Sequence, residues 1–98
     1  MRLKWAAATR RDLASILAFI AQHNPEAAFE QIQRIDARAD DLIQYPELGR
    51  PGRLPSTREL VVPGTSYLLI YHRVPSGVEI LRVLHGAQEW PSRTTGRR

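Results

Sequence analysis

The groups best able to do chemistry in this chain of 98 residues lie in its C-terminal half. Cleavage of RNA through its 2′-hydroxyl needs a base for that hydroxyl, cations for the crowded phosphate and an acid for the leaving 5′-oxygen. Side chains of the right chemical types for these tasks lie within residues 58–85: Arg58, Glu59, Tyr71, His72, Arg73, Arg82 and His85.

The same residues also have plainer structural interpretations. Arg58 with Glu59, and Arg82 with Glu79, would form charge pairs on a sheet face. His85 would end a strand and bond to the backbone. Residue types alone leave both interpretations open.

The alternation of side chains along a strand separates two of these candidates. On a regular strand, Arg82 shares a face with Ile80 and Leu84. His85 shares the opposite face with Val83. Arg82 and His85 would therefore meet only if the strand ended or bulged near Leu84.

The positive charge of the chain is concentrated in its second half. The formal net charge is +4, and residues 1–45 hold as many acidic as basic side chains, so the excess lies in residues 46–98. Thirteen of the fourteen cations are arginine, whose planar fork suits two-pronged binding of phosphate or carboxylate. An acidic protein and a nucleic acid would both fit this balance.

Several classes of function are disfavoured by what the chain lacks. It has no cysteine, and its three histidines lack metal-ligand spacing with a carboxylate, so we expect neither a metal site nor a cofactor. It has no apolar run approaching the roughly 20 residues of a membrane span, and no secretory signal. We therefore expect a cytoplasmic protein without membrane contact.

Hydrophobic spacing predicts two helices after a short N-terminal strand. Residues 3–6 alternate as that strand. Thr9 with Asp12 forms a capping box for a first helix that runs to about residue 22. Asn24 and Pro25 begin a second helix, which ends before Pro46.

The rest of the fold follows from residues 58–86. Three apolar, β-branched and aromatic runs are separated by turn formers at 63–65 and 75–77, which predicts a three-strand antiparallel meander. The fold class is then α+β in two layers, with an N-terminal strand, an antiparallel helical hairpin and the meander. Residues 1–91 would form a single domain, and the basic residues 92–98 a disordered tail.

Both faces of the predicted middle strand are apolar, although a helical hairpin can cover only one of them. Leu68 and Ile70 lie on one face, and Tyr67, Leu69 and Tyr71 on the other. We therefore expect a partner protein or a second copy of the chain to cover the second face.

Arg50 and Arg53 lie in a loop rich in proline and glycine, residues 46–57, and these residue types give the loop a defined shape. We expect these two arginines to contact a partner, together with Arg58, Arg73 and Trp90. The plainer interpretation is a solvated loop for the arginines and edge packing for Trp90.

An ordered set of segments spans residues 2–91, and none of them is diagnostic alone. These are Asp12-Leu13 with Ile16 and Ile20, then residues 24–28, 46–53, 57–62, 67–71 and 78–86. Together they resemble the RelE/ParE superfamily of bacterial type II toxin–antitoxin toxins. The resemblance is closer to its ParE, plasmid-stabilisation branch.

The resemblance implies a small toxin that a cognate antitoxin neutralises, and whose first strand lies beside its last. It also implies that operator DNA is contacted only through the antitoxin. ParE-like members poison DNA gyrase by binding it, whereas RelE-like members cleave messenger RNA in the ribosome. The lysine-rich loop common in such nucleases is absent, because Lys4 is the one lysine here.

We therefore expect a growth inhibitor that binds and poisons gyrase, with no catalytic residues of its own. The alternative is a ribosome-dependent mRNA endonuclease with Arg58, Arg82 and His85 at its site. A further alternative is a non-toxic member that binds only antitoxin and operator DNA. Loss of the Arg82 and His85 side chains would abolish the nuclease and spare the binding poison.

Overall fold

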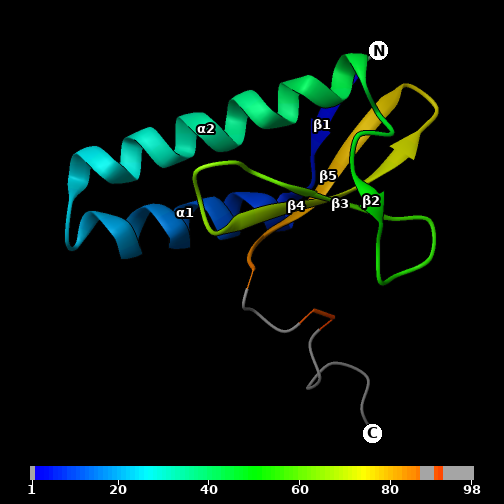
Figure 1. Cartoon of the computed structure of the whole chain (residues 1–98). Coiled ribbons are helices and arrows are strands. Elements are labelled where there is room, and N and C mark those ends of the chain that lie inside the picture. Colours follow the sequence, from blue (N-terminus) through cyan, green and yellow to red (C-terminus); the bar gives the residue numbers. More distant parts are fainter. Residues whose placement is uncertain (1, 87–89, 92–98) are drawn as a thin grey trace, which may run out of the picture.

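The computed structural model describes residues 2–86 and 90–91, which form two helices packed on one sheet (Figure 1). The elements in chain order are β1 (Arg2–Trp5), α1 (Ala7–Ala21), α2 (Pro25–Gln44), β2 (Arg50–Pro51), β3 (Arg58–Val61), β4 (Tyr67–Val74) and β5 (Gly77–His85). The predicted α+β fold with its helical hairpin and meander is confirmed. The predicted disordered tail, residues 92–98, lies outside the described residues.

The sheet has the order β1-β5-β4-β3-β2, so the first strand lies beside the last, as the resemblance implied. The β1–β5 pair is parallel, and every other pair is antiparallel. The two-residue strand β2 was not predicted, because it lies in the proline- and glycine-rich loop and shows no alternation. Neither helix in the described part of the chain is both long and apolar enough to cross a membrane.

The two helices begin in different ways. α2 starts as predicted: Pro25 is its first residue, and the side chain of Asn24 accepts a hydrogen bond from the amide of Ala27 at 3.1 Å. The predicted cap of α1 at Thr9 is wrong, because the helix already begins at Ala7. Thr9 is instead buried in the first turn, where its hydroxyl donates to the carbonyl of Ala6.

The main core lies between the helical hairpin and one face of the sheet (Figure 1). Both helices and every strand from β3 to β5 contribute buried side chains, including Ile16, Ile35, Leu42, Leu60, Leu69, Tyr71, Val78, Ile80 and Val83. Each fully buried large apolar side chain contributes about 1.5–3 kcal/mol to folding, before the loss of conformational entropy. This layer therefore supplies most of the stability that fixes the sheet.

A register shift in β5 changes which side chains share a face. Ile70 pairs with Arg82 while the next residue of β4, Tyr71, pairs with Ile80, so one extra residue is accommodated in β5. Such a bulge moves the following side chains to the opposite face. Val83 consequently lies in the main core with Ile80, and the predicted grouping of Ile80 with Leu84 is wrong.

The face of the sheet turned away from the helices, here called the outer face, carries Val61, Leu68, Ile70 and Leu84. Leu68, Ile70 and Leu84 are buried in a second cluster, against which Trp90 packs. The chain's own Trp90 thus covers part of the face for which we expected a partner protein or a second copy, and that expectation stays a prediction. Val61 on the same face remains 52% exposed.

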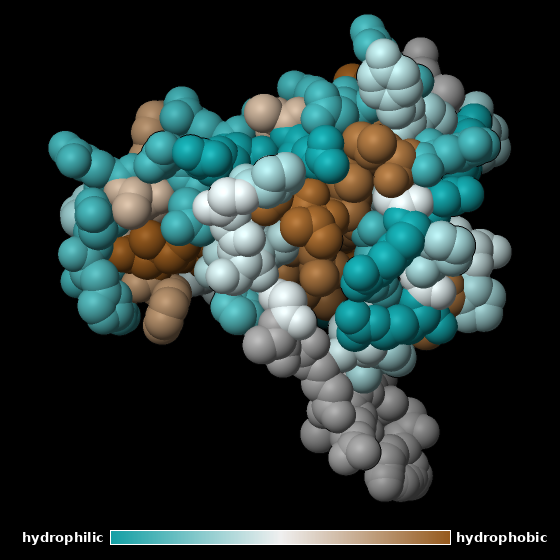
Figure 2. All heavy atoms as spheres, in the orientation of Figure 1, coloured by the Kyte–Doolittle hydropathy of each residue, from teal (hydrophilic) through white to brown (hydrophobic). Residues whose placement is uncertain are grey.

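Other apolar side chains also reach solvent. Figure 2 shows them on the visible side in two areas, one near the closed end of the helical hairpin and one near the middle of the molecule. Phe19 of α1 and Phe29 of α2 are each 64% exposed. Exposed apolar side chains that gather together commonly mark interaction surfaces.

Replacement of Gly77 by alanine should detach β1 from the sheet. A Cβ at this position would overlap the carbonyl oxygen of Arg2, its partner in β1, and the backbone φ is +153°. We expect Gly77→Ala to lower the free energy of unfolding by at least about 2 kcal/mol in urea titrations. Gly86→Ala is the control, since the nearest contact of its Cβ would be an ordinary 3.4 Å. Equal stability of the two variants would contradict the prediction.

Candidate functional site

The three residues considered for RNA cleavage do not share one location. Arg58 on β3 pairs with Tyr71 of β4, whereas His85 on β5 pairs with Tyr67 of β4. Four residues along β4 and two strand spacings across the sheet place the Cα atoms of Arg58 and His85 about 16 Å apart. Arg58 and His85 therefore lie at separate places on the sheet.

Arg58 holds the loop that follows α2. Its guanidinium donates hydrogen bonds to the carbonyl oxygens of Gly49 at 2.7 Å and Glu47 at 3.4 Å. The predicted pairing of Arg58 with Glu59 is wrong, because Arg58 turns toward the helix side of the sheet with Tyr71 while Glu59 faces the other side.

Tyr71 fixes the same loop from inside the core. Its hydroxyl donates to the carbonyl of Pro46 at 2.7 Å and accepts from the amide of Gly49 at 2.9 Å. A Cβ on Gly49 would lie 2.8 Å from the Tyr71 ring, so this approach requires glycine. Burial raises the pKa of Tyr71, although the Gly49 amide opposes the change. The phenol is thus held by two hydrogen bonds to this loop, and its role here is structural.

Arg82 is held by Asp12 of α1. Its Nε and Nη2 atoms each donate to one carboxylate oxygen at 2.8 Å, and Asp12 also accepts from the amide of Val83 at 2.9 Å. Hydrogen bonding to Asp12 raises the pKa of Arg82, despite the opposing effect of partial burial. The predicted Arg82–Glu79 pair is wrong, because Glu79 lies 2.8 Å from a ring nitrogen of His72.

Arg82 and His85 nevertheless approach one hollow, between α1 and the end of β5. Its volume is about 410 Å³, and its lining consists of Asp12, Ser15, Ile16, Phe19, Tyr67, Arg82, Val83 and His85. The ring of His85 packs edge-on to Tyr67, with 5.6 Å between their centroids. This hollow brings together a cation, a carboxylate and an imidazole, and Arg58 is not part of it.

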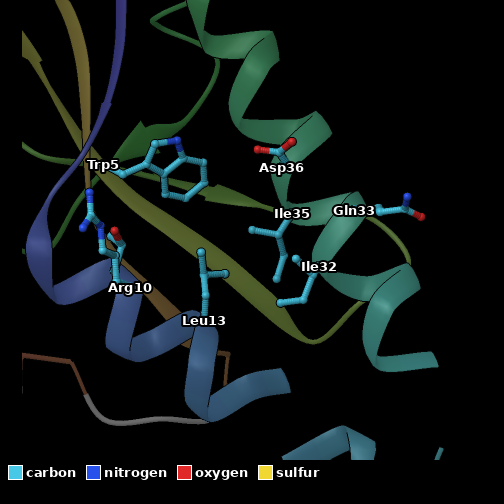
Figure 3. Close-up of a pocket in the computed structure, with 8 residues that line it drawn as sticks. Trp5, Arg10, Leu13, Ile32, Gln33, Ile35 and Asp36 are labelled. Atoms are coloured by element: carbon cyan, nitrogen blue, oxygen red, sulfur yellow. The ribbon is translucent and has the colours of Figure 1, made fainter. Parts of the chain in front are cut away.

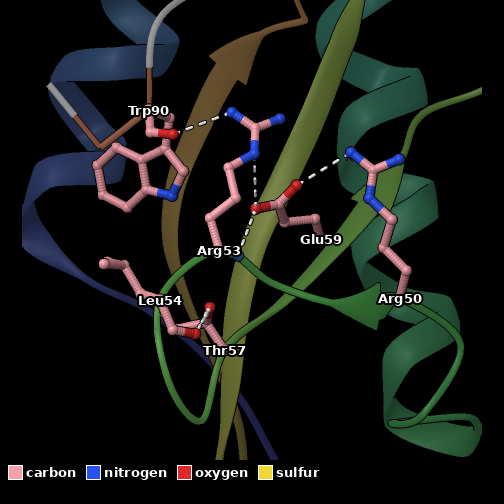
Figure 4. A network of polar contacts seen from close by, with 6 residues as sticks. All are labelled: Arg50, Arg53, Leu54, Thr57, Glu59 and Trp90. Carbon is pink, nitrogen blue, oxygen red and sulfur yellow. Dashed lines mark hydrogen bonds and ion pairs between the residues drawn. The ribbon is translucent and has the colours of Figure 1, made fainter.

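A second polar cluster lies beyond β3, where Glu59 binds two arginines (Figure 4). Its carboxylate lies 3.0 Å from Nη2 of Arg50, 3.5 Å from Nε of Arg53 and 3.1 Å from the amide of Arg53. Arg53 also donates to the carbonyl of Trp90 at 3.0 Å. Burial favours a higher pKa for Glu59, but the Arg53 amide and both guanidinium groups together lower it.

The residues predicted to contact a partner are divided between the two faces of the sheet. Arg50 pairs with Glu59 and so lies on the outer face, with Arg53 and Trp90 next to it. Arg58 and Arg73 alternate with this set and lie on the opposite face. A single flat partner could therefore contact only part of the predicted set.

A further hollow, not predicted from the sequence, lies between α1, α2 and β1 (Figure 3). It measures about 370 Å³ and is lined by Trp5, Thr9, Arg10, Leu13, Ile32, Gln33, Ile35 and Asp36. No sequence signal indicates it, because it depends on how far the two helices diverge. Within residues 2–86 and 90–91, no three histidine, aspartate or glutamate side chains are placed to hold a metal ion.

Two solved structures share this architecture. The chromosomal ParDE TA system from P. aeruginosa matches with a TM-score of 0.78 and 25% identity, over 87% of this chain and 95% of that chain. The toxin–antitoxin complex RelBE2 from Mycobacterium tuberculosis matches with a TM-score of 0.53 and 30% identity, over 85% and 94%. The fold is thus that of the small α+β proteins of toxin–antitoxin systems.

Sequence comparison identifies the family. The profile described as ParE toxin of type II toxin-antitoxin system, parDE, matches residues 3–90. Y4kP of Sinorhizobium fredii is 43% identical over 90 residues, which are 92% of this chain and 93% of that protein. Toxin RelE2 of Caulobacter vibrioides is 33% identical over 84 residues, or 86% and 93%. The chain belongs to the ParE toxin family of type II toxin–antitoxin systems, and the resemblance seen in its sequence is confirmed.

Removal of the Asp12 carboxylate should weaken the attachment of α1 to the sheet. Asp12→Ala loses two charge-assisted hydrogen bonds and one to a backbone amide, so we expect the free energy of unfolding to fall by about 2–4 kcal/mol. Chemical denaturation followed by circular dichroism measures this change. Asp36→Ala, at an exposed position of α2, should change stability by less than about 0.5 kcal/mol. A similar small effect for Asp12→Ala would show that the contact is not structural.

Glu59 should make the fold sensitive to acid. Because its pKa is lowered in the folded protein, ionised Glu59 stabilises the fold above the ordinary value of 4.5, and this stabilisation is lost as the pH falls through the lowered value. We expect the free energy of unfolding of Glu59→Gln to be lower than that of the native protein by about 1–3 kcal/mol at pH 7. This difference should disappear in acid. Urea midpoints measured from pH 7 to about pH 3 test this.

The control for this series is Glu30→Gln, because Glu30 forms an exposed pair with Arg34 on α2. Exposed pairs contribute little, so the free energy of unfolding of Glu30→Gln should differ from that of the native protein by less than about 0.5 kcal/mol at every pH. A pH-independent gap for Glu59→Gln would contradict the assigned role of its charge.

Proposed function

We propose that this toxin arrests growth by binding and poisoning DNA gyrase, and that a cognate antitoxin holds it inactive. Membership of the ParE family supports the gyrase target, since ParE-like toxins are the gyrase-binding branch of the superfamily. The antitoxin is supported by two similar structures, one of a ParDE system and one of a RelBE2 toxin–antitoxin complex. Operator DNA is then reached only through the antitoxin.

One observation carries this proposal. The cationic groups that a nuclease would need are already bound to other parts of the protein. Arg58 is directed at two loop carbonyls, and Arg82 is held in a two-pronged contact by Asp12. Stabilising a pentacovalent phosphate requires cations already aimed at it. Neither guanidinium is arranged in this way, which favours a toxin that acts by binding.

A ribosome-dependent mRNA endonuclease remains the second candidate, because one observation favours it. Arg82, His85 and Asp12 line the same hollow, which lies between α1 and β5. Such a nuclease would use His85 as the proton-transfer group and would have to free Arg82 from Asp12 when it met the ribosome.

Two assays run in parallel on the purified toxin separate these candidates. We expect inhibition of gyrase supercoiling and intact message in a ribosome-programmed cleavage assay. His85→Ala should leave gyrase inhibition within about twofold, because the imidazole has no chemical role in a binding poison. Cleaved message with normal supercoiling, lost in His85→Ala, would reverse the order of the two candidates.

His72→Ala is the matched control, since His72 is also a strand histidine that reaches solvent and lies outside the hollow. Expression of the native toxin without its antitoxin should arrest growth. Normal growth with folded toxin present would point instead to a non-toxic member that binds only antitoxin and operator DNA.

A further inference from the structure

The two helices of the hairpin carry the same spacing of exposed side chains where they lie side by side. Each helix has three exposed residues separated by four and then three positions: Arg10, Ala14 and Leu17 on α1, and Phe29, Gln33 and Asp36 on α2. Residues with this spacing lie on one face of a helix. Both sets border the same crevice, because Arg10, Gln33 and Asp36 line one hollow. Together they form a surface, here called the hairpin face.

The open end of the hairpin face is recessed. The hollow of about 370 Å³ between α1, α2 and β1 lies there, and its lining includes the apolar side chains of Trp5, Leu13 and Ile32. Figure 3 shows Arg10 and Asp36 on opposite sides of the Trp5 ring. An apolar cavity of about 150 Å³ is enough to take a benzene ring. This hollow can therefore receive an aromatic side chain from outside.

The closed end of the hairpin face projects instead. Phe29 is 64% exposed and Leu17 is 43% exposed. Phe29 comes seven residues before Asp36, and Leu17 comes seven residues after Arg10. At 1.5 Å per residue, this separation places the projecting side chains about 10 Å from the rim of the hollow. Phe29 is thus too far away to fill the hollow of its own chain.

A two-fold rotation brings the projecting part of one chain to the hollow of another. The helices are antiparallel neighbours (Figure 1). An axis that crosses them near Ala14 and Gln33 lies midway between the projection and the hollow. Rotation about this axis places each Phe29 at the hollow of the other copy, so that the surface is complementary to itself. It also places Glu30 opposite Arg34 of the second copy, so these exposed charges attract across the contact.

We propose that the hairpin face binds a second copy of this chain, in a symmetric homodimer where Phe29 of each copy fills the hollow of the other. Arg10 at the rim then lies over the inserted ring, an attractive arrangement for a cation. Another protein would have to supply an aromatic side chain of its own, whereas the second copy already carries one at the required distance. The proposal does not depend on whether gyrase or messenger RNA is the target.

The first test is the oligomeric state of the full-length toxin, measured by sedimentation velocity at increasing concentrations. We expect a reversible dimer. Phe29→Ser should raise its dissociation constant by at least roughly a hundredfold, because a symmetric contact loses two buried rings at once. Phe19→Ser is the matched control, since Phe19 is also 64% exposed but lines the hollow beside Asp12. It should leave the dissociation constant unchanged, and circular dichroism should show both variants folded.

The second test locates the two-fold axis by cross-linking. The chain has no cysteine, so a single introduced thiol reports on one position. Gln33→Cys, next to the axis, should be joined into a covalent dimer by a short bismaleimide. Ser76→Cys, exposed in the turn between β4 and β5, should remain a monomer.

Three outcomes would overturn the proposal. The first is a toxin that stays monomeric at every concentration, including one whose neutralisation by the antitoxin is weakened in Phe29→Ser, because the hairpin face would then bind the antitoxin. The second is equal dissociation of Phe19→Ser and Phe29→Ser, which would place the dimer contact elsewhere. The third is cross-linking of Ser76→Cys as rapid as that of Gln33→Cys.

Discussion

The carboxylate of Asp12 accepts three hydrogen bonds at the edge of β5 that β1 no longer covers, because β1 has ended there. It accepts a hydrogen bond from the amide of Val83, as a backbone carbonyl would if β1 were longer. From the same position it also accepts hydrogen bonds from the guanidinium of Arg82. α1 is thereby attached to the edge of the sheet beside the bulge. The orientation of the helical layer, and the hollow next to it, depend on this contact.

Several of the arginines that the structure describes in the second half of the chain are structural. Arg58 holds carbonyls of the loop after α2, Arg53 links Glu59 to Trp90, and Arg82 binds Asp12. Each contact uses the planar, multidonor shape of guanidinium, which lysine lacks. The excess of arginine is therefore explained in part by folding, and net charge alone overstates what is available to bind a ligand.

The parts of the fold that follow from local rules could be predicted from the sequence. Asn24 and Pro25 define the start of α2, and turn formers separate β3, β4 and β5, because these signals act over a few residues. The bulge in β5 and the Asp12–Arg82 contact could not be predicted. The Asp12–Arg82 contact joins residues 70 positions apart in the sequence, and the bulge, which no local pattern marks, reversed the expected faces of Val83 and Leu84.

The pairing of the first strand with the last determines how early the chain can fold during its synthesis. β1 is the first of these elements to be made, whereas its partner β5 is the last of them. The helices have no complete sheet to cover until that strand is made. A growing chain therefore cannot complete its sheet before its last strand is made, which leaves an interval in which an antitoxin made at the same time can meet the unfinished toxin.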